Sequence, residues 1–208
     1  AGAARVTDDA FSVVTDPEVD IVVELIGGYG VARELVLKAI EYGKHVVTAN
    51  KALLATHGNE IFAAAQKKGV MVGFEAAVAG GIPIIKALRE GLTANRIQWI
   101  AGIINGTTNF ILSEMREKGM SFESVLAAAQ KLGYAEADPT FDIEGIDAAH
   151  KLSIMSAIAF GIPMQFDKCY TEGISRLTRE DIAYAEQLGY RIKLLGITKR
   201  KAHGVELR

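Results

Sequence analysis

The chain has 208 residues, of which half are hydrophobic and 23% are charged, and its formal net charge is −2. This composition is typical of a soluble globular protein that can bury one large core or two smaller ones. The near-neutral charge gives no attraction for nucleic acid or for an anionic membrane. The single cysteine, Cys169, excludes an internal disulfide framework and fits a reducing compartment. Since no apolar run is long enough to span a bilayer, we expect a cytoplasmic protein.

The first part of the chain alternates strand-like and helix-like segments with short loops. Such alternation predicts right-handed crossovers and a parallel sheet. The first run is β-branched and ends at two glycines, which is typical of a strand buried on both faces. Ligands bind at the carboxyl ends of such strands. The predicted elements are a strand over 19–26, a helix over 32–42, a strand over 45–48, a helix over 59–68 and a strand over 70–74.

The pattern changes after Gly80, where we place a domain boundary. Residues 1–80 are then expected to form one half of a Rossmann-type nucleotide-binding domain, and residues 81–208 an α+β domain. The fold class is therefore α/β, with a partial parallel sheet first. In the second domain we predict a helix over 82–91, a strand over 96–104, helices over 107–118 and 121–131, a long helix ending at Phe160, a helix over 178–188, and strands over 191–198 and 205–208.

Acidic residues are concentrated between Leu132 and Lys151, next to an apolar run. A solvated helix face interleaves its charges with apolar residues, whereas most of these acids fall in a loop. Asp147 and Lys151 stand four residues apart, so a helix would place them on one face. A lysine beside a carboxylate at the rim of an apolar helix can have its proton affinity tuned for acid–base catalysis. This stretch is a candidate active site.

Three other stretches follow strands and allow two interpretations each. Lys51, after the strand at 45–48, is either a solvated lysine or a cation that reaches a ligand. The small residues of 75–83 serve either tight packing or a loop that coordinates a monovalent cation. The turn at 105–109 either caps a helix or contacts a ligand. The four histidines show no metal-ligand spacing.

These segments, in this order, resemble homoserine dehydrogenases. The resemblance rests on VVELIGG, KHVVTANKALLA, GFEAAVAGGIPII, INGTTNFIL and LGYAEADPTFDIEGIDAAHKL, which together extend from about Asp20 to Ile162. It implies NADPH- or NADH-dependent reduction of aspartate 4-semialdehyde to L-homoserine, on the route to threonine and methionine. It also implies a homodimer with a Rossmann-type domain, a dimerisation segment and an α+β catalytic domain.

The resemblance also assigns roles to single residues. Lys151 would be the proton donor, oriented by Asp147, and Lys51 would lie beside the nicotinamide and the reacting centre. The remaining roles are as follows: Glu136, Asp142, Asn105, Gly106 and Thr107 would bind the substrate, Gly27 and Ala76 would face NADP or NAD, and Glu75, Val78, Gly80 and Ile82 would hold a sodium or potassium ion.

Two features depart from the family pattern. The glycine-rich pyrophosphate turn, G-x-G-x-x-G, is not in the sequence. The carboxyl-terminal segment that completes the nucleotide domain is not in it either, and the chain begins at Ala1 without a methionine. We therefore expect a piece of a longer enzyme that by itself binds the cofactor poorly and turns over slowly. The alternatives are a sugar or polyol dehydrogenase, and a non-catalytic dimerisation or regulatory module.

Overall fold

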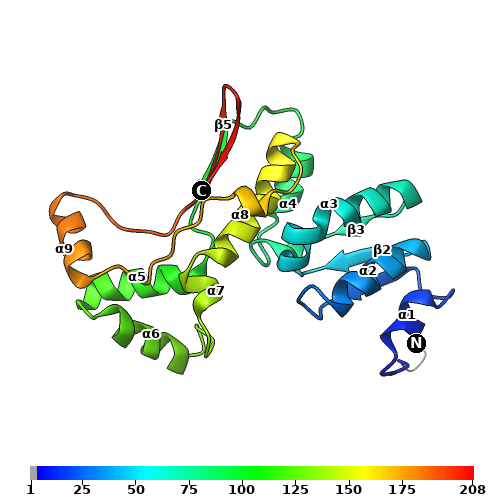
Figure 1. Cartoon of the computed structure of the whole chain (residues 1–208), viewed down its shortest axis with the longest axis horizontal. Helices are drawn as coiled ribbons and strands as arrows, with labels where there is room; N and C mark the ends of the chain where they lie inside the picture. The colour runs from blue at the N-terminus through cyan, green and yellow to red at the C-terminus, as the bar shows by residue number, and fades with distance from the viewer. Residues whose placement is uncertain (1–3) are drawn as a thin grey trace. The chain divides into compact units, whose positions relative to one another are not determined.

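The computed structural model describes residues 4–208, which divide into two compact units. The first unit extends to Ala94 and includes Ile162–Met164, and the second comprises Asn95–Gly161 and Gln165–Arg208. Figure 1 shows their helices and strands, most of them labelled. The expected domain boundary near Gly80 stays a prediction, since a compact unit and a domain need not end at the same residue.

The first unit contains a three-stranded parallel sheet, as the sequence predicted. Its order is β1-β2-β3, with Ile21 opposite His45 and Val46 opposite Val72. Helix α2 packs against β1, β2 and α3, and α1 packs against α2. The elements are α1 (Ala10–Thr15), β1 (Ile21–Glu24), α2 (Val31–Glu41), β2 (His45–Thr48), α3 (Lys51–Lys68) and β3 (Val72–Gly73).

The prediction that the first strand is buried on both faces is wrong. Ile21 and Val23 are 56% and 59% exposed, and Val47 of β2 is also exposed. Val46 and Thr48 point to the opposite face and are buried. Because neighbouring residues of a strand point to opposite faces, only one face of this sheet is covered within residues 4–208.

Helix α3 begins eight residues earlier than expected. Asn50 caps it, since its side-chain oxygen accepts a hydrogen bond from the Leu53 N–H at 3.1 Å. Gly58, which resembles a helix breaker in the sequence, lies inside the helix. A Cβ atom there would lie 2.7 Å from Sδ of Met164. The glycine therefore permits close packing and does not end the helix.

The predicted helix over 82–91 is broken into shorter pieces. Within that range lie α4 (Ile84–Lys86) and the π-helical turn η2 (Ala87–Gly91), and the 3₁₀ turn η1 (Glu75–Ala77) precedes them. Pro83 is the N-cap of α4 and does not lie in its first turn. The carboxylate of Glu75 accepts hydrogen bonds from the Ile85 and Lys86 N–H groups, both at 2.8 Å. These bonds fix η1 against the start of α4.

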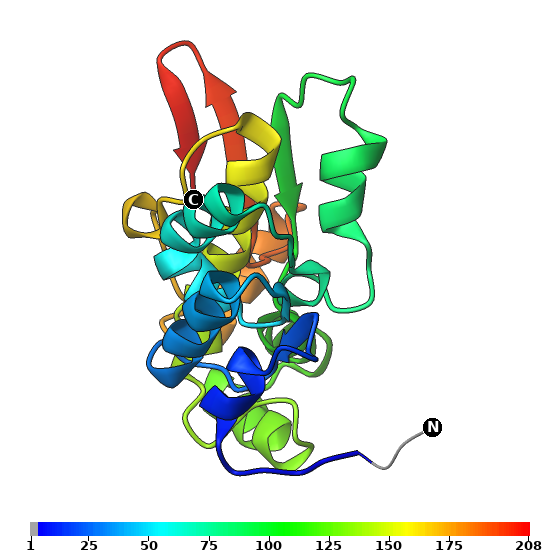
Figure 2. The ribbon, with the colours of Figure 1, turned by 90° about the vertical axis from the view of Figure 1, so that its right-hand side faces the viewer.

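The second unit is built around a three-stranded antiparallel sheet of order β4-β5-β6 (Figure 2). Trp99 of β4 lies opposite Lys199, and Thr198 of β5 lies opposite Leu207. Helix α8 packs against β5 and β6. The elements are β4 (Trp99–Gly102), α5 (Gly106–Lys118), α6 (Phe122–Lys131), α7 (Thr140–Ile143), α8 (Ile146–Phe160), η3 (Phe166–Lys168), α9 (Arg179–Gln187), β5 (Gly196–Lys201) and β6 (Gly204–Leu207).

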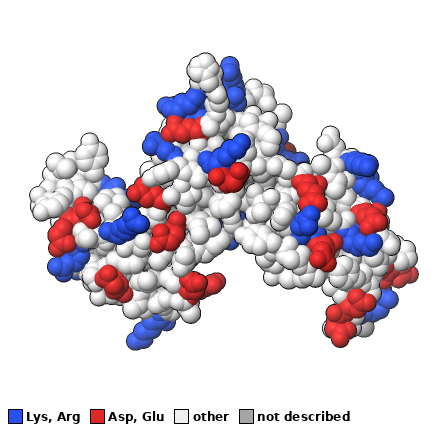
Figure 3. All heavy atoms as spheres, in the orientation of Figure 1, with Lys and Arg blue, Asp and Glu red and all other residues white. Residues whose placement is uncertain are grey.

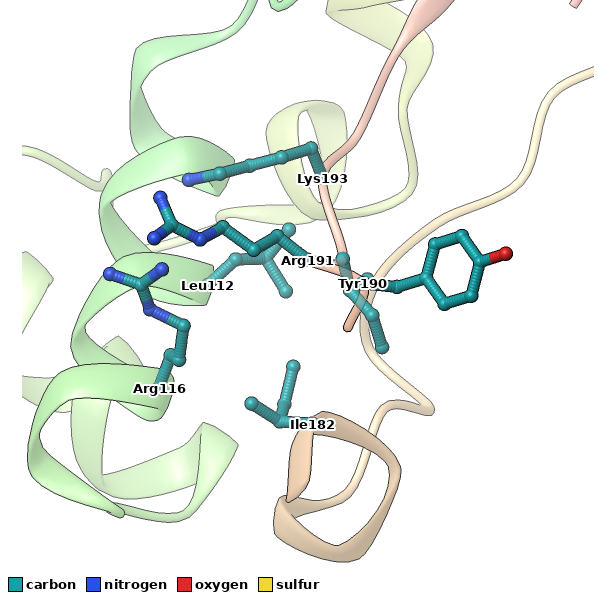
Figure 4. A pocket seen from close by; sticks show the side chains of 7 residues that line it. Leu112, Arg116, Ile182, Tyr190, Arg191 and Lys193 are labelled. Carbon is teal, nitrogen blue, oxygen red and sulfur yellow. The ribbon is translucent and has the colours of Figure 1, made fainter. Parts of the chain in front are cut away.

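Strand β5 begins five residues later than predicted, because the preceding segment packs on helices. Ile192 and Leu194 pack against the helical core of this unit. Between them, the Lys193 ammonium donates to Oδ1 of Asn109 at 2.6 Å and to Oγ of Ser113 at 2.9 Å. Figure 4 shows Lys193, Arg191 and Arg116 extending side by side where residues 190–193 pass α5. The alternating pattern of this segment thus reflects side-chain packing and not sheet pairing.

The core of the second unit lies among α5, α6 and α9. Ile111 is fully buried there, and Val125 and Ile182 reach it from the neighbouring helices. Acidic and basic residues are intermixed on the face shown in Figure 3. Among residues 4–208, no helix combines the length and the apolar character needed to cross a membrane. The buried members of the core are Ile111, Leu112, Met115, Phe122, Val125, Ala129, Ala135, Ile174 and Ile182.

Replacing Ile111 by Ala should destabilise this core by about 2–5 kcal/mol, because it leaves a cavity at a fully buried position. Hydrogen exchange of the α5 and α6 amides in the complete protein would measure the loss. Leu188→Ala is the control, since Leu188 is 74% exposed, and it should change the opening free energy by less than about 0.5 kcal/mol. Equal effects of the two substitutions would contradict the assignment of the core.

The start of α9 should be sensitive to pH. The Thr178 N–H and hydroxyl donate to the Asp181 carboxylate at 2.9 and 2.8 Å, and these bonds hold its pKa below the ordinary value. Because the folded pKa is the lower one, the stabilisation is complete above the unfolded pKa and is lost as the pH falls through the folded pKa. Hydrogen exchange of α9, corrected for intrinsic rates, should show this loss in wild type and not in Asp181→Asn. Glu180→Gln, in the same turn, should behave like wild type.

Candidate active site

The centre of the candidate site is an ion pair on α8. The Lys151 ammonium donates to Oδ2 of Asp147 at 2.6 Å and to the carbonyl oxygen of Ile104 at 2.9 Å. The two side chains are only 19% and 6% exposed. Their spacing of one helical turn places them on one face, as the sequence predicted. Since an ammonium group has three N–H donors, two are used here and one remains for a further acceptor.

Asn105 connects this pair to a second carboxylate. Its amide nitrogen donates to Oδ2 of Asp147 at 2.9 Å and to Oδ1 of Asp142 at 2.7 Å. Its carbonyl oxygen accepts from the backbone N–H and the hydroxyl of Thr108, both at 2.8 Å. Asn105 is the N-cap of α5. The site is therefore fixed at one point by three helices, α5, α7 and α8.

The environment of the ion pair is largely closed. Asp147, Asn105 and Thr108 are buried. His150, also on α8, is buried against the rings of Phe141 and Phe166, at centroid distances of 5.2 and 4.2 Å. Charges and hydrogen bonds interact more strongly where water is excluded. The ion pair between Asp147 and Lys151 therefore lies where little water reaches it.

The other substrate residues expected from the sequence lie at the edge of this site. Gly106 and Thr107 form the first turn of α5, and the Thr107 hydroxyl donates to the Tyr134 carbonyl at 2.9 Å. This bond holds the loop before Glu136 against α5. The Gln130 amide donates to the Glu136 carbonyl at 3.0 Å, and the side chain of Glu136 is exposed. In the described part of the chain, that carboxylate makes no hydrogen bond or ion pair with the cluster.

The first unit contains a buried carboxylate that the sequence interpretation missed. Glu24 ends β1 and is 3% exposed. One of its oxygens accepts the N–H groups of Ile26 and Gly27 at 2.8 and 3.0 Å, and the other accepts the Thr48 hydroxyl at 2.6 Å. Gly27, the expected cofactor contact, has φ +83°, a conformation that favours glycine. Glu24 therefore fixes the turn that carries Gly27.

Thr48 and Asn50 extend this network to Lys51. The Thr48 hydroxyl accepts from the Asn50 N–H at 2.9 Å, and the Asn50 amide donates to the Gly28 carbonyl at 2.9 Å. Lys51 is the first residue of α3, directly after its Asn50 cap. The carboxyl ends of β1 and β2 are thus joined, as expected for a ligand-binding edge of a parallel sheet.

The loop predicted to bind a cation follows β3. Ala76 lies within η1, and Ala79 and Gly80 both have positive φ, +60° and +57°. Within residues 4–208, the carbonyl oxygens of Val78 and Gly80 accept no hydrogen bond. Ile82 is exposed. Oxygen atoms are the ligands that hard cations prefer, so the Val78 and Gly80 carbonyls fit such an ion, while the Ile82 carbonyl already accepts the Ile84 N–H at 2.8 Å. The described residues contain no group of three or more His, Cys, Asp or Glu placed to hold a metal.

Comparison with known families identifies the chain. Residues 83–208 match the family model described as homoserine dehydrogenase, and residues 1–75 match the NAD-binding domain of homoserine dehydrogenase. The chain belongs to the homoserine dehydrogenase family. The match to its NAD-binding domain supports a nicotinamide cofactor, and the predicted α/β fold class is confirmed by structural relatives of the chain.

Individual members of the homoserine dehydrogenase family resemble the chain closely. The homoserine dehydrogenase of Pseudomonas aeruginosa is 73% identical over 100% of this chain and 48% of its own length. The crystal structure of a homoserine dehydrogenase from Thiobacillus denitrificans is 78% identical, with a TM-score of 0.96 over 97% of this chain and 47% of that one. A hyperthermophilic archaeal homoserine dehydrogenase in complex with NADPH is 27% identical, with a TM-score of 0.78 over 96% of this chain and 58% of that one. The chain spans about half the length of the curated relatives it matches.

The buried Glu24 network generates a prediction about the turn at Gly27. Glu24→Ala should leave two N–H groups and the Thr48 hydroxyl without their acceptor, at a cost of about 1–3 kcal/mol. Hydrogen exchange at residues 26–28 should become faster. Glu41→Ala, which removes an exposed carboxylate paired with Lys38, is the control and should leave those amides unchanged. Unchanged exchange in Glu24→Ala would show that the turn does not depend on the carboxylate.

Proposed function

We propose that the protein carrying this chain interconverts L-aspartate 4-semialdehyde and L-homoserine with NADP or NAD. The observation that carries the proposal is the buried Lys151, held by Asp147 at 2.6 Å and by the Ile104 carbonyl at 2.9 Å. A fixed ammonium group with one N–H remaining is suited to give a proton to a carbonyl oxygen. Membership of the homoserine dehydrogenase family supports the choice of substrate.

In the direction of reduction, a nicotinamide held at the cofactor edge of the first unit would supply the hydride that the aldehyde carbon needs. Lys151 donates a hydrogen bond to the aldehyde oxygen and then transfers its proton as the C=O bond becomes C–O–H. Asp147 stabilises the ammonium form before the transfer and holds the neutral amine in place afterwards. In the reverse direction, the neutral Lys151 amine accepts the hydroxyl proton. The balance is one aldehyde, one hydride and one proton for one alcohol.

The acidic residues around Lys151 account for an amino-acid substrate. We assign Glu136 to the substrate ammonium, because its exposed carboxylate lies next to a loop fixed on α5. Asp142 would order the site together with Asn105. Gly106 and Thr107, in the first turn of α5, would offer backbone N–H groups to the substrate. A neutral polyol would need no such ammonium pocket.

The first unit would supply the cofactor edge. Gly27, Lys51 and Ala76 all lie at the carboxyl ends of its parallel strands, where nucleotides bind. The oxygens of Glu75, Val78, Gly80 and Ile82 would hold a sodium or potassium ion, which would stabilise the turn that contains Ala79. A homodimer in the cytoplasm completes the proposal, and the family resemblance supports both features.

Lys151→Ala in the complete protein should lower kcat by about 10²–10⁴-fold, because general acid–base assistance is lost. Lys151→Arg should be nearly as slow, since arginine keeps the charge and the donors but does not release a proton. The assay follows nicotinamide absorbance with aspartate semialdehyde as substrate.

The matched control is Lys193→Ala, which removes a partly buried lysine of the same unit that is hydrogen-bonded to Asn109 and Ser113. This variant should lose stability but keep most of its kcat. Equal kcat values for the Lys151 and Lys193 variants would argue against Lys151 as the proton donor. An inactive wild type would refute the choice of substrate.

A further inference from the structure

All the hydrogen-bonding capacity of Asn105 is used inside the protein. Its two N–H groups are directed to Asp142 and Asp147, and its carbonyl oxygen receives both donors of Thr108. The side chain is 5% exposed. A carboxamide has two N–H donors and one acceptor oxygen with two lone pairs. No donor or acceptor of Asn105 remains for a substrate, so its influence on the reaction must pass through the two carboxylates.

The first effect of Asn105 is to keep Asp142 apart from the lysine. Among the described residues, Lys151 donates hydrogen bonds to Ile104 and Asp147, while Oδ1 of Asp142 is held by the Asn105 amide. A second carboxylate on the ammonium would bind its proton more strongly, because an opposite charge favours the charged form. The amide therefore limits Lys151 to one ionic partner.

The second effect concerns Asp147 itself. Its Oδ2 atom accepts hydrogen bonds from both Lys151 and Asn105. The hydrogen bond from the Asn105 amide partly offsets the negative charge of this oxygen, so the oxygen attracts the Lys151 ammonium less strongly. The same amide thus directs one N–H donor to each of the two carboxylates.

We propose that Asn105 is a positioning residue that sets how strongly the Asp147–Asp142 pair holds the proton of Lys151. This inference rests on the proposed function, in which Lys151 exchanges a proton with the substrate oxygen. It replaces direct substrate binding by Asn105 with an action through Asp142 and Asp147.

Lys151 is faced by few charged groups within its unit. Asp147 lies on its own helix, and Asp142 reaches the cluster from α7. The other elements that pack on α8 carry Lys199, Arg200, Lys201 and Glu206 on β5 and β6, and Asp167 and Lys168 on η3. None of these six side chains makes a hydrogen bond or an ion pair with Lys151. Among these groups only Asp147 bonds Lys151 directly, and Asp142 is connected to that pair through Asn105.

The loss of Asn105 should change the pH dependence of homoserine oxidation. Lys151 must be neutral to accept the hydroxyl proton, so kcat/KM rises as the lysine loses its proton. Without the amide, Asp142 is released to turn toward the ammonium, and the full charge of Asp147 acts on it, so the proton is held more tightly. The rising limb of the pH profile should then move to higher pH by roughly one unit in Asn105→Ala. It should move further in Asn105→Asp, which adds a third carboxylate.

The experiment measures kcat and KM for homoserine oxidation against pH in the complete protein. Asn109→Ala is the control, because it is the same substitution one turn further along α5 and removes a hydrogen bond from Lys193 instead. Its rising limb should coincide with that of wild type. Thr108→Val removes only one hydroxyl donor to Asn105 and should shift the rising limb slightly to higher pH. This variant tests the inference if the Asn105 variants do not fold.

The outcomes separate the two proposals. An active wild type with upward shifts in the Asn105 or Thr108 variants, and not in Asn109→Ala, supports the inference. If the Asn105 variants are active and their pH profiles coincide with that of wild type, the role of Asn105 is overturned and the proposed function stands. If the Asn105 variants do not fold, a Thr108→Val profile that coincides with wild type leads to the same conclusion. A folded wild type without turnover would overturn the proposed function, and the inference with it.

Discussion

The candidate site of the second unit depends on a buried ion pair. Removing an ammonium and a carboxylate from water costs several kcal/mol per ion, unless good geometry and further hydrogen bonds offset it. Asp147 and Lys151 meet this condition with a 2.6 Å contact, the Ile104 carbonyl and the Asn105 amide. Ile104 lies just after β4, and Asn105 is the N-cap of α5. The ion pair therefore requires that α8 and the β4–α5 turn keep a fixed relative position.

The first unit also contains a buried carboxylate, which is stabilised by hydrogen bonds without a cation. Glu24 is buried and its carboxylate is satisfied by two backbone N–H groups and one hydroxyl. In both units an asparagine after a strand caps the next helix, Asn50 for α3 and Asn105 for α5. In both units the amide of that asparagine also reaches a distant group, the Gly28 carbonyl or the two aspartates. The cap thus links helix formation to the geometry of a site.

The sequence was sufficient for features that depend on local spacing. The pairing of Asp147 with Lys151 follows from helical periodicity, and the parallel sheet follows from the alternation of strands and helices. The contact between Asn105 and Asp142 joins residues 37 positions apart, and no local pattern specifies it. Glu24 was missed because it stands within an apolar run. A lone carboxylate at a strand end before two glycines is the signal that could have indicated a buried acceptor for a turn.

The role proposed for Lys151 accounts for a lysine at this position. An arginine could satisfy both Asp147 and the Ile104 carbonyl, and its planar, delocalised charge is easier to bury. It would keep its proton throughout, because a guanidinium group does not deprotonate in proteins. A histidine is shorter and carries at most two N–H groups, so it could not bond Asp147, Ile104 and a substrate at once. Only an ammonium group combines three donors with a proton that can be released, and the polar partners around it make that group tolerable in a buried place.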